Sequence, residues 1–384
     1  MQLSAKTTRL ISLAACVVLA LSFQPLSGKL SAAEKPRLST DWWPMQGAAA
    51  LGFVGSAACS PCHAQLVAAH QVTGMAKALR SAENCQVLAS HPSLTFRNGE
   101  YSYQMVRQSG RGLYRVSYRD ESISAPLSYC FGHGETGQTY LLQYNGAFYE
   151  SRVSFYPAVE RLDFTLGAPR TEPESLEAAL GQKLTPEDAR KCFSCHATNA
   201  VSETQELRLE GLIPGIGCEA CHGPAAAHVA AVKAGQPPQT GFFSAKHMAA
   251  DELSQRFCGS CHRSFAEVMT MPDLGGTGNL RFQPYRLAKS SCYSSDPKDR
   301  RISCIACHDP HAAVVREPAF YDAKCLACHA SSANSPAGAT AKACRTSTKK
   351  CSACHLPETA IPGAHARLTD HFIRIVRPGA SYPN

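Results

Sequence analysis

Seven copies of one pattern, Cys-x-x-Cys-His, contain 14 of the 19 cysteines in this 384-residue chain. The copies are Cys59-Cys62-His63, Cys192-Cys195-His196, Cys218-Cys221-His222, Cys258-Cys261-His262, Cys304-Cys307-His308, Cys325-Cys328-His329 and Cys351-Cys354-His355. The pattern is the attachment sequence for c-type haem, in which two thiols form thioethers with the porphyrin and the histidine gives the iron its first axial nitrogen. The sequence therefore predicts seven covalent haem c groups.

A single copy of the pattern could instead be a thiol redox pair or one half of a zinc site. Zinc ribbons do not need a histidine after every cysteine pair, so the sevenfold repetition favours haem. The stretch of about residues 92–168 contains no convergent set of acid, base or nucleophile residues, and we assign no catalytic residue.

A low-spin electron-transfer haem needs a second strong axial ligand, commonly histidine or methionine. Eight histidines lie outside the motifs, which is enough to close seven irons within one chain. The residues that we expect to be second ligands are His91, His228, His247, His311, His365 and His371. His228 and His311 follow their own motifs too closely to reach over the same haem, so we expect each to bind a neighbouring iron.

The second ligand of the first haem stays open between His70 and Met75, both on a helix that we expect over residues 64–80. A methionine on such a helix is often a core residue, and as a ligand it would raise the haem's potential. His133 stands between two glycines, and we expect it to be a surface or hydrogen-bonded residue.

Four further cysteines follow the amino-terminal segment: Cys85, Cys130, Cys292 and Cys344. An even number in an oxidising compartment indicates two disulfides. The pairing Cys85 with Cys130 and Cys292 with Cys344 is favoured because each bond then stays within one half of the chain. Free thiols are the alternative.

The amino end has the features of a secretory signal peptide over residues 1–33. Lys6 and Arg9 precede an apolar run, and the small residues Ser31 to Ala33 follow it. An uncleaved anchor or a lipoprotein acylated at Cys16 are the alternatives. We expect a periplasmic protein, with outer-membrane attachment or an extracellular site as alternatives and peripheral membrane association possible.

The formal net charge of +8 overstates how basic the working protein is. Residues 1–33 contain three cations and no acid, and each ferric haem with its propionates adds about −1, which gives about −2 for an exported heptahaem protein. This charge gives no support for a nucleic-acid partner. The expected partners are other redox proteins, such as cytochromes and quinol-linked or terminal oxidoreductases.

The spacing of the motifs predicts an α+β chain of three parts after the signal peptide: a first haem segment (34–91), a β-rich insert (92–180) and a hexahaem domain (181–384). Alternating aromatic and β-branched residues predict a small antiparallel sheet in the insert, and Asn145-Gly146 predicts a hairpin turn. The hexahaem domain is expected to consist of short helices and loops around stacked haems, because it is too short to build a large side-chain core.

Four segments resemble the multihaem cytochrome c superfamily, in particular relatives of the tetrahaem cytochromes c of nitrifiers with doubled motifs. The segments are residues 54–59, Cys218 to Pro224 with His228, Cys304 to His311, and His365 to His371. The resemblance implies stacked haem pairs with mostly bis-histidine ligation, and His228, His311, His365 and His371 as distal ligands. Relatives often have His-Ala where this chain has Met75-Ala76, so the first haem is expected to be His–Met, to recruit His70, or to be open.

The leading expectation is an electron carrier without a substrate of its own. A reductase of small nitrogen or sulfur oxyanions at one open haem is the first alternative, and a subunit of a polymerising extracellular filament is the second. The sequence does not fix the oligomeric state.

Overall fold

The computed structural model describes residues 52–202, 205–237, 243–271, 276–330, 344, 346–377, 379 and 382–383. The predicted signal peptide, residues 1–33, lies outside the described residues. The chain divides into two compact units, Met1–Arg37 and Leu38–Asn384, and all described residues belong to the second.

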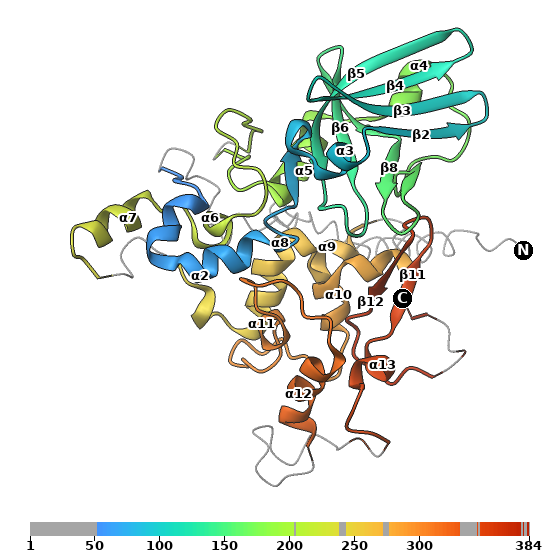
Figure 1. Ribbon diagram of the computed structural model, residues 1–384. Helices are drawn as coiled ribbons and strands as arrows, with labels where there is room; N and C mark the ends of the chain where they lie inside the picture. Colours follow the sequence, from blue (N-terminus) through green and yellow to red (C-terminus); the bar gives the residue numbers. More distant parts are fainter. Residues whose placement is uncertain are drawn as a thin grey trace, which may run out of the picture. The chain divides into compact units, whose positions relative to one another are not determined.

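An antiparallel sheet of eight strands follows the first motif, with the strand order β10-β7-β6-β5-β4-β3-β2 and with β1 paired to β5. Its strands are β1 (Leu79–Ser81), β2 (Ser93–Asn98), β3 (Tyr101–Gln108), β4 (Arg111–Tyr118), β5 (Glu121–Phe131), β6 (Thr139–Tyr144), β7 (Ala147–Ser151) and β10 (Gly181–Lys183). Figure 1 shows β2 to β5 side by side as long neighbouring strands. A separate hairpin consists of β8 (Val153–Tyr156) and β9 (Arg161–Phe164).

The turn between β6 and β7 is the hairpin turn predicted from Asn145-Gly146. Asn145 has a φ of 49° and Gly146 a φ of 76°, so both turn residues lie in the left-handed region. A type I′ turn requires this conformation, and asparagine and glycine adopt it at the least steric cost. The two strands pair from Tyr144 opposite Ala147 back to Leu141 opposite Glu150.

The sheet contains the main side-chain core of the described chain. Alternate residues of its strands are fully buried, among them Tyr103, Tyr114 and Tyr140. Of the twelve largest side chains with under 2 % exposure, ten lie between residues 79 and 162. Phe193 and Arg286 are the other two, so the part of the chain that contains six of the seven motifs has little aliphatic core of its own.

Short helices make up most of the remaining described chain, and Figure 1 labels most of them. They are α2 (Ser60–Gln71), α3 (Gln86–Ser90), α4 (Leu176–Leu180), α5 (Pro186–His196), α6 (Cys218–His222), α7 (Ala226–Lys233), α8 (Gly259–His262), α9 (Phe265–Met269), α10 (Gln283–Ala288), α11 (Cys304–Cys307), α12 (Pro318–His329) and α13 (Cys351–His355). Further helical turns are η2 (Ser56–Cys59), η3 (Ala82–Asn84), η4 (Ala245–His247), η5 (Glu252–Cys258) and η6 (Gly276–Arg281). A second hairpin, β11 (Glu358–Ile361) with β12 (Ala366–Thr369), lies near the carboxyl end and was not predicted.

The helix predicted over residues 64–80 is shorter than expected. It ends at Gln71, and a turn in which Thr73 Oγ1 accepts a hydrogen bond from the Ala76 backbone N–H at 3.1 Å follows it. Leu79 then begins β1, because pairing with β5 satisfies the backbone there. The expectation of a mixed helical and antiparallel-sheet protein is confirmed.

Candidate functional site

Each of the seven Cys-x-x-Cys-His motifs forms or ends a helical turn. The motifs occupy, in chain order, the start of α2, the end of α5, α6, the junction of η5 with α8, α11 with His308 after it, the end of α12, and α13. Residues three and four positions apart on a helix share one face. In motifs that lie wholly within a helix, such as Cys218 to His222 and Cys351 to His355, the two thiols and the imidazole therefore point to the same side. His63 and His308 have non-helical backbone angles. A porphyrin needs this arrangement because its two vinyl groups lie on one edge and its iron lies at the centre.

Backbone carbonyl groups fix the orientation of three motif histidines. The Nδ1 atoms of His196, His222 and His355 lie 3.0 Å from Ala78 O, 2.9 Å from Phe243 O and 3.1 Å from Arg374 O. When Nδ1–H donates to such a carbonyl oxygen, Nε2 keeps its lone pair for a metal ion. Sequence reasoning did not identify these carbonyl groups, since their residues are 19 or more positions away from the histidines that they orient.

Burial keeps the imidazoles of the central motifs neutral, as axial ligation requires. It lowers the pKa of His196, His262 and His308 below the usual histidine value. The pKa of His371 falls to about 4, chiefly because of burial and further because His308 is close. A neutral imidazole presents a lone pair at physiological pH without losing a proton first.

Two of the predicted distal histidines lie opposite a motif histidine. The ring centroids of His222 and His311 are 6.0 Å apart and their planes differ by 5°. The rings of His308 and His371 are 6.2 Å apart and differ by 38°. Metal–imidazole bonds of about 2.0 Å on opposite sides of one ion place the ring centroids about 6 Å apart. Both pairs therefore have the spacing that two axial ligands of one iron require.

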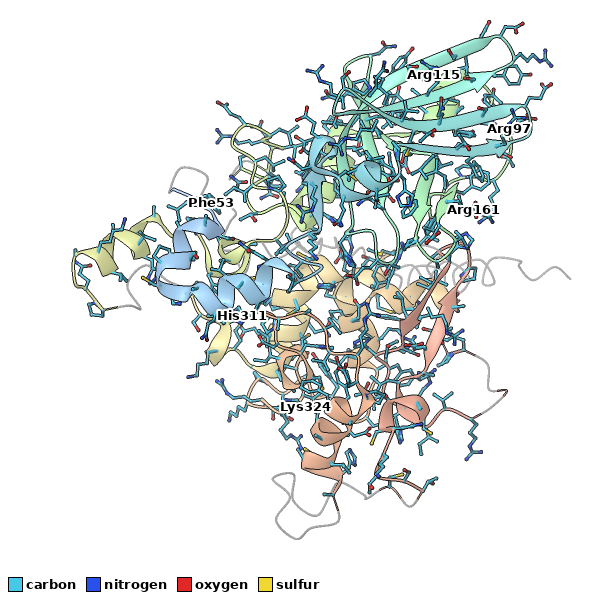
Figure 2. The ribbon with its side chains drawn as sticks, in the orientation of Figure 1. Phe53, Arg97, Arg115, Arg161, His311 and Lys324 are labelled. Atoms are coloured by element: carbon cyan, nitrogen blue, oxygen red, sulfur yellow. The ribbon has the colours of Figure 1, made fainter. Side chains whose placement is uncertain are left out.

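The predicted ligand His311 faces a neighbouring motif rather than its own. His311 belongs to the segment after α11, whereas His222 ends α6. Figure 2 labels His311 near α2. Burial is the main cause of the lowered pKa of His70 on that helix, and the charges of His311 and His222 lower it further. His70, His222 and His311 thus lie close to one another.

The attachment cysteines of different motifs lie close to each other. The pairs that are close enough to affect each other's thiol pKa are Cys59 and Cys218, Cys195 and Cys261, Cys258 and Cys304, and Cys325 and Cys351. In a haem-bound protein these sulfur atoms would be thioethers, so the pairs indicate how close the attachment points are. They place the first motif near the third, the second near the fourth, the fourth near the fifth, and the sixth near the seventh.

Two longer-range effects act between these pairs. The nearby Cys304 thiol is the largest reason that the pKa of Cys258 is raised, and the charge of Cys221 in the third motif adds to the rise. Burial chiefly raises the pKa of Cys325, and the charge of Cys307 in the fifth motif contributes. Each motif therefore has a cysteine of another motif nearby, and cysteines of the second, third and fifth motifs affect the pKa of those in the fourth.

Other predicted ligands have different surroundings. His365 Nε2 lies 2.7 Å from Asp163 Oδ2 of β9, and its ring packs against Tyr156. His91 ends α3 and packs its ring against Phe155 of the sheet region, with ring centroids 4.8 Å apart. The structure does not place either of them opposite a motif histidine. His228 lies on α7, and the side chain of His247 at the end of η4 lies outside the described side chains.

Around the first motif, Met75 packs in an apolar cluster with Ile216 and Ala220. His133 reaches the same segment, because a Cβ atom on Gly74 would fall 3.0 Å from its ring. His133 Nδ1 also lies 3.7 Å from a carboxylate oxygen of Glu135. The second ligand of this motif therefore stays open among His70, Met75 and no protein ligand.

Neither disulfide expected from the sequence is formed in the structure, where all four cysteines are thiols. Cys85 and Cys130 are nevertheless both buried, and the nearby Cys130 thiol is the largest cause of the lowered pKa of Cys85. Cys85 Sγ donates a hydrogen bond to Gln138 Oε1 at 2.8 Å. The neighbours of Cys292 include Cys328 and Arg301, whereas those of the exposed Cys344 are Thr346 and Ser347. The members of the first predicted pair thus lie close together, and those of the second do not.

Large apolar side chains are exposed mainly outside the sheet. Nine of the ten that the described residues expose lie before β1 or after β10, with Ile375 at 76 % exposure and Val314 at 67 %. A porphyrin face is a broad apolar surface that buries such side chains. The motif turns, the oriented imidazoles and these apolar residues fit haem c.

Motif turns with this chemistry are those by which c-type cytochromes of the multihaem class attach their haem groups. The model of the family described as "Cytochrome c554 and c-prime" matches residues 166–223, which contain the second and third motifs. The chain is also similar to the multiheme cytochrome MtrA of Shewanella baltica (strain OS185), with 24 % identity over 214 residues, 52 % of this chain and 54 % of the relative. The chain thus spans about half the length of this curated relative.

A solved structure, the outer cell wall cytochrome OcwA, is similar to 55 % of this chain at 16 % sequence identity and a TM-score of 0.34, and 37 % of its own chain is covered. The family model and the curated relative are both multihaem or c-type cytochromes, in agreement with the haem attachment motifs of this chain. Among the described residues, no helix combines the length and the apolar character that crossing a bilayer requires.

Proposed function

We propose that this chain is an exported heptahaem cytochrome c that carries electrons between redox partner proteins in the periplasm. The observation that carries the proposal is the facing pairs His222–His311 and His308–His371, whose ring spacing is that of two axial ligands of one iron. Attachment cysteines of different motifs also lie close to one another. Close attachment points allow close porphyrin edges, and an electron carrier needs a continuous series of haems. The haem would supply the redox chemistry, and the chain's own cysteines and histidines would hold it.

The histidine pairs support mostly bis-histidine ligation. His222 with His311 and His308 with His371 have the spacing of axial ligands, and a closed coordination sphere suits electron transfer rather than substrate binding. A relation to the tetrahaem cytochromes c of nitrifiers is part of this proposal. It rests on the doubled motifs and on the segments that contain His311 and His371.

The test is a haem count by pyridine haemochrome on the purified oxidised protein, combined with low-temperature electron paramagnetic resonance (EPR). We expect seven haems per chain with low-spin signals. A high-spin signal of about one haem per chain, altered by nitrite or cyanide, would favour the alternative of a reductase with its open iron at the first motif. Oligomers that grow with protein concentration in light scattering would favour a filament subunit.

A further inference from the structure

A fully buried ion pair lies beside the His308–His371 pair. Arg286 of α10 donates two hydrogen bonds to Asp370, from Nε to Oδ1 at 2.8 Å and from Nη2 to Oδ2 at 2.9 Å. Both side chains are 0 % exposed. Arg374 donates a further hydrogen bond from Nη1 to Asp370 Oδ2 at 2.6 Å. Two guanidinium groups and one carboxylate form this buried charge cluster, in which the Arg374 side chain is 18 % exposed, and the three groups together leave one surplus positive charge.

The buried charge cluster fixes the segment that contains His371. Asp370 Oδ1 also accepts a hydrogen bond from the Phe372 backbone N–H at 3.0 Å, and Arg374 Nη1 donates to Phe372 O at 2.9 Å. Ser290, at the end of α10, accepts from the Ile373 backbone N–H at 2.8 Å. The backbone on the carboxyl side of His371 is therefore held by side-chain contacts at successive residues.

The same segment orients a second motif. His355 of the seventh motif places Nδ1 3.1 Å from Arg374 O, and the Arg374 backbone N–H donates to His355 O at 3.2 Å. Arg374 also donates to Asp370, so one buried carboxylate is connected to two candidate axial ligands. These ligands are His371 across from His308, and His355.

Stability alone does not account for the cluster. Removing charges from water costs several kcal/mol per ion, and well-packed apolar residues often replace a buried ion pair without loss of stability. A bidentate guanidinium–carboxylate pair instead provides a fixed geometry. The arrangement suits a role in which the direction of a neighbouring side chain matters.

We propose that Arg286, Asp370 and Arg374 are positioning residues that hold His371 and His355 as axial ligands and favour the reduced state of the iron at His308. The proposal rests on the proposed function. Reduction removes one positive charge from a haem, and a fixed positive charge nearby is repelled less by the reduced form. Substitutions that remove the geometry and substitutions that remove the charge should therefore have different effects.

The experiment uses the full-length holoprotein with the variants Asp370→Asn, Arg286→Lys and Arg374→Gln, read by EPR and by redox titration of the haem absorbance. Arg286→Lys keeps the charge but not the bidentate pair, so we expect altered g values for about one haem in seven. Arg374→Gln removes a charge, so we expect a lower potential for at least one haem. Asp370→Asn should change both the EPR spectrum and the titration.

Matched controls come from the exposed pair Arg367–Glu358 of the second hairpin, whose side chains are 61 % and 65 % exposed. Arg367→Lys and Glu358→Gln make the same chemical changes at the surface and should leave both measurements as in the unchanged protein. If Asp370→Asn fails to accumulate, Arg286→Lys and Ser290→Ala still test the positioning role.

Wild-type spectra and potentials in folded Arg286→Lys and Arg374→Gln proteins, with only a lower unfolding midpoint, would overturn the inference. The haem count of the unchanged protein separates this failure from failure of the proposed function. If the unchanged protein contains seven haems and the variant spectra equal its own, the positioning role alone is refuted. If the unchanged protein does not contain seven haems, the proposed function is refuted.

Discussion

Glu219 shows how one side chain can connect two motifs. It lies between the cysteines of the third motif and is 2 % exposed. Its carboxylate accepts hydrogen bonds from the backbone N–H groups of Val54 at 2.9 Å, Gly55 at 2.8 Å and Ala225 at 2.9 Å. Val54 and Gly55 lead directly into the first motif, so this carboxylate holds the two attachment sites together.

The variant Glu219→Gln should destabilise the protein by about 1–3 kcal/mol. An amide NH2 group replaces one carboxylate oxygen, and this group cannot accept the hydrogen bond of the backbone N–H that it faces. The measurement is the urea midpoint followed by Soret absorbance. Glu187→Gln is the control, since Glu187 forms an exposed pair with Lys191 at 2.9 Å and should leave the midpoint unchanged. Equal midpoints for the two variants would show that Glu219 does not hold the motifs together.

At the level of elements, a carboxylate from one helix caps the next. Asp322 of α12 accepts hydrogen bonds from the backbone N–H groups of Lys350 and Cys351, each at 2.7 Å, where α13 begins. Lys350 has a φ of 58°, so the chain enters the seventh motif through a left-handed residue that these bonds hold. A helix start leaves such backbone donors without intrahelical partners, which Asp322 supplies.

This cap predicts a pH dependence. The hydrogen bonds from Cys351 and Lys350 lower the pKa of Asp322. Because the folded-state pKa lies below the ordinary value of about 3.9, the cap contributes fully above that pH and is lost as the pH falls through the folded-state pKa. Amide hydrogen exchange over residues 350–356 should accelerate on acidification, after correction for the intrinsic rate.

The variant Asp322→Asn should show fast exchange over the same residues at neutral pH, with little further acceleration in acid. Asp296→Asn is the matched control, because Asp296 accepts a backbone hydrogen bond from Lys298 in an exposed loop. If Asp322→Asn and Asp296→Asn exchange alike over residues 350–356, the cap does not stabilise α13.

At the level of the whole molecule, local patterns were predictable and long-range neighbours were not. The Asn145-Gly146 hairpin depends on two adjacent residues, and the sequence predicts it. The sequence also suggested His311 and His371 as ligands, but it did not indicate that Asp163, 202 positions away, would contact His365. Arg286 is a single arginine in a short helix. The residues next to it in the sequence do not indicate that it forms a buried ion pair with Asp370.

Which motifs lie near each other also depends on the fold as a whole, because sequence order does not follow spatial order. A cysteine of the first motif lies near one of the third, and a cysteine of the second lies near one of the fourth. The spacing of the motifs in the sequence does not predict which motifs are neighbours in space. The sheet of residues 79–183 separates the first motif from the others along the chain. Figure 2 shows labelled Arg97 and Arg115 on that sheet and Lys324 on the helical segment of the sixth motif.

The fourth motif has the most neighbours among the motifs, because cysteines of the second, third and fifth motifs are near enough to affect the pKa of its thiols; we expect it to be the junction of the haem series. The double variant Cys258→Ala/Cys261→Ala should lose this junction, whereas Cys351→Ala/Cys354→Ala should lose an end of the series. We expect about six haems per chain in each. After rapid mixing with substoichiometric reductant, the junction variant should show an added slow phase of electron redistribution. The end variant should redistribute in one fast phase like the unchanged protein, and matching kinetics in the two variants would contradict the central place of the fourth motif.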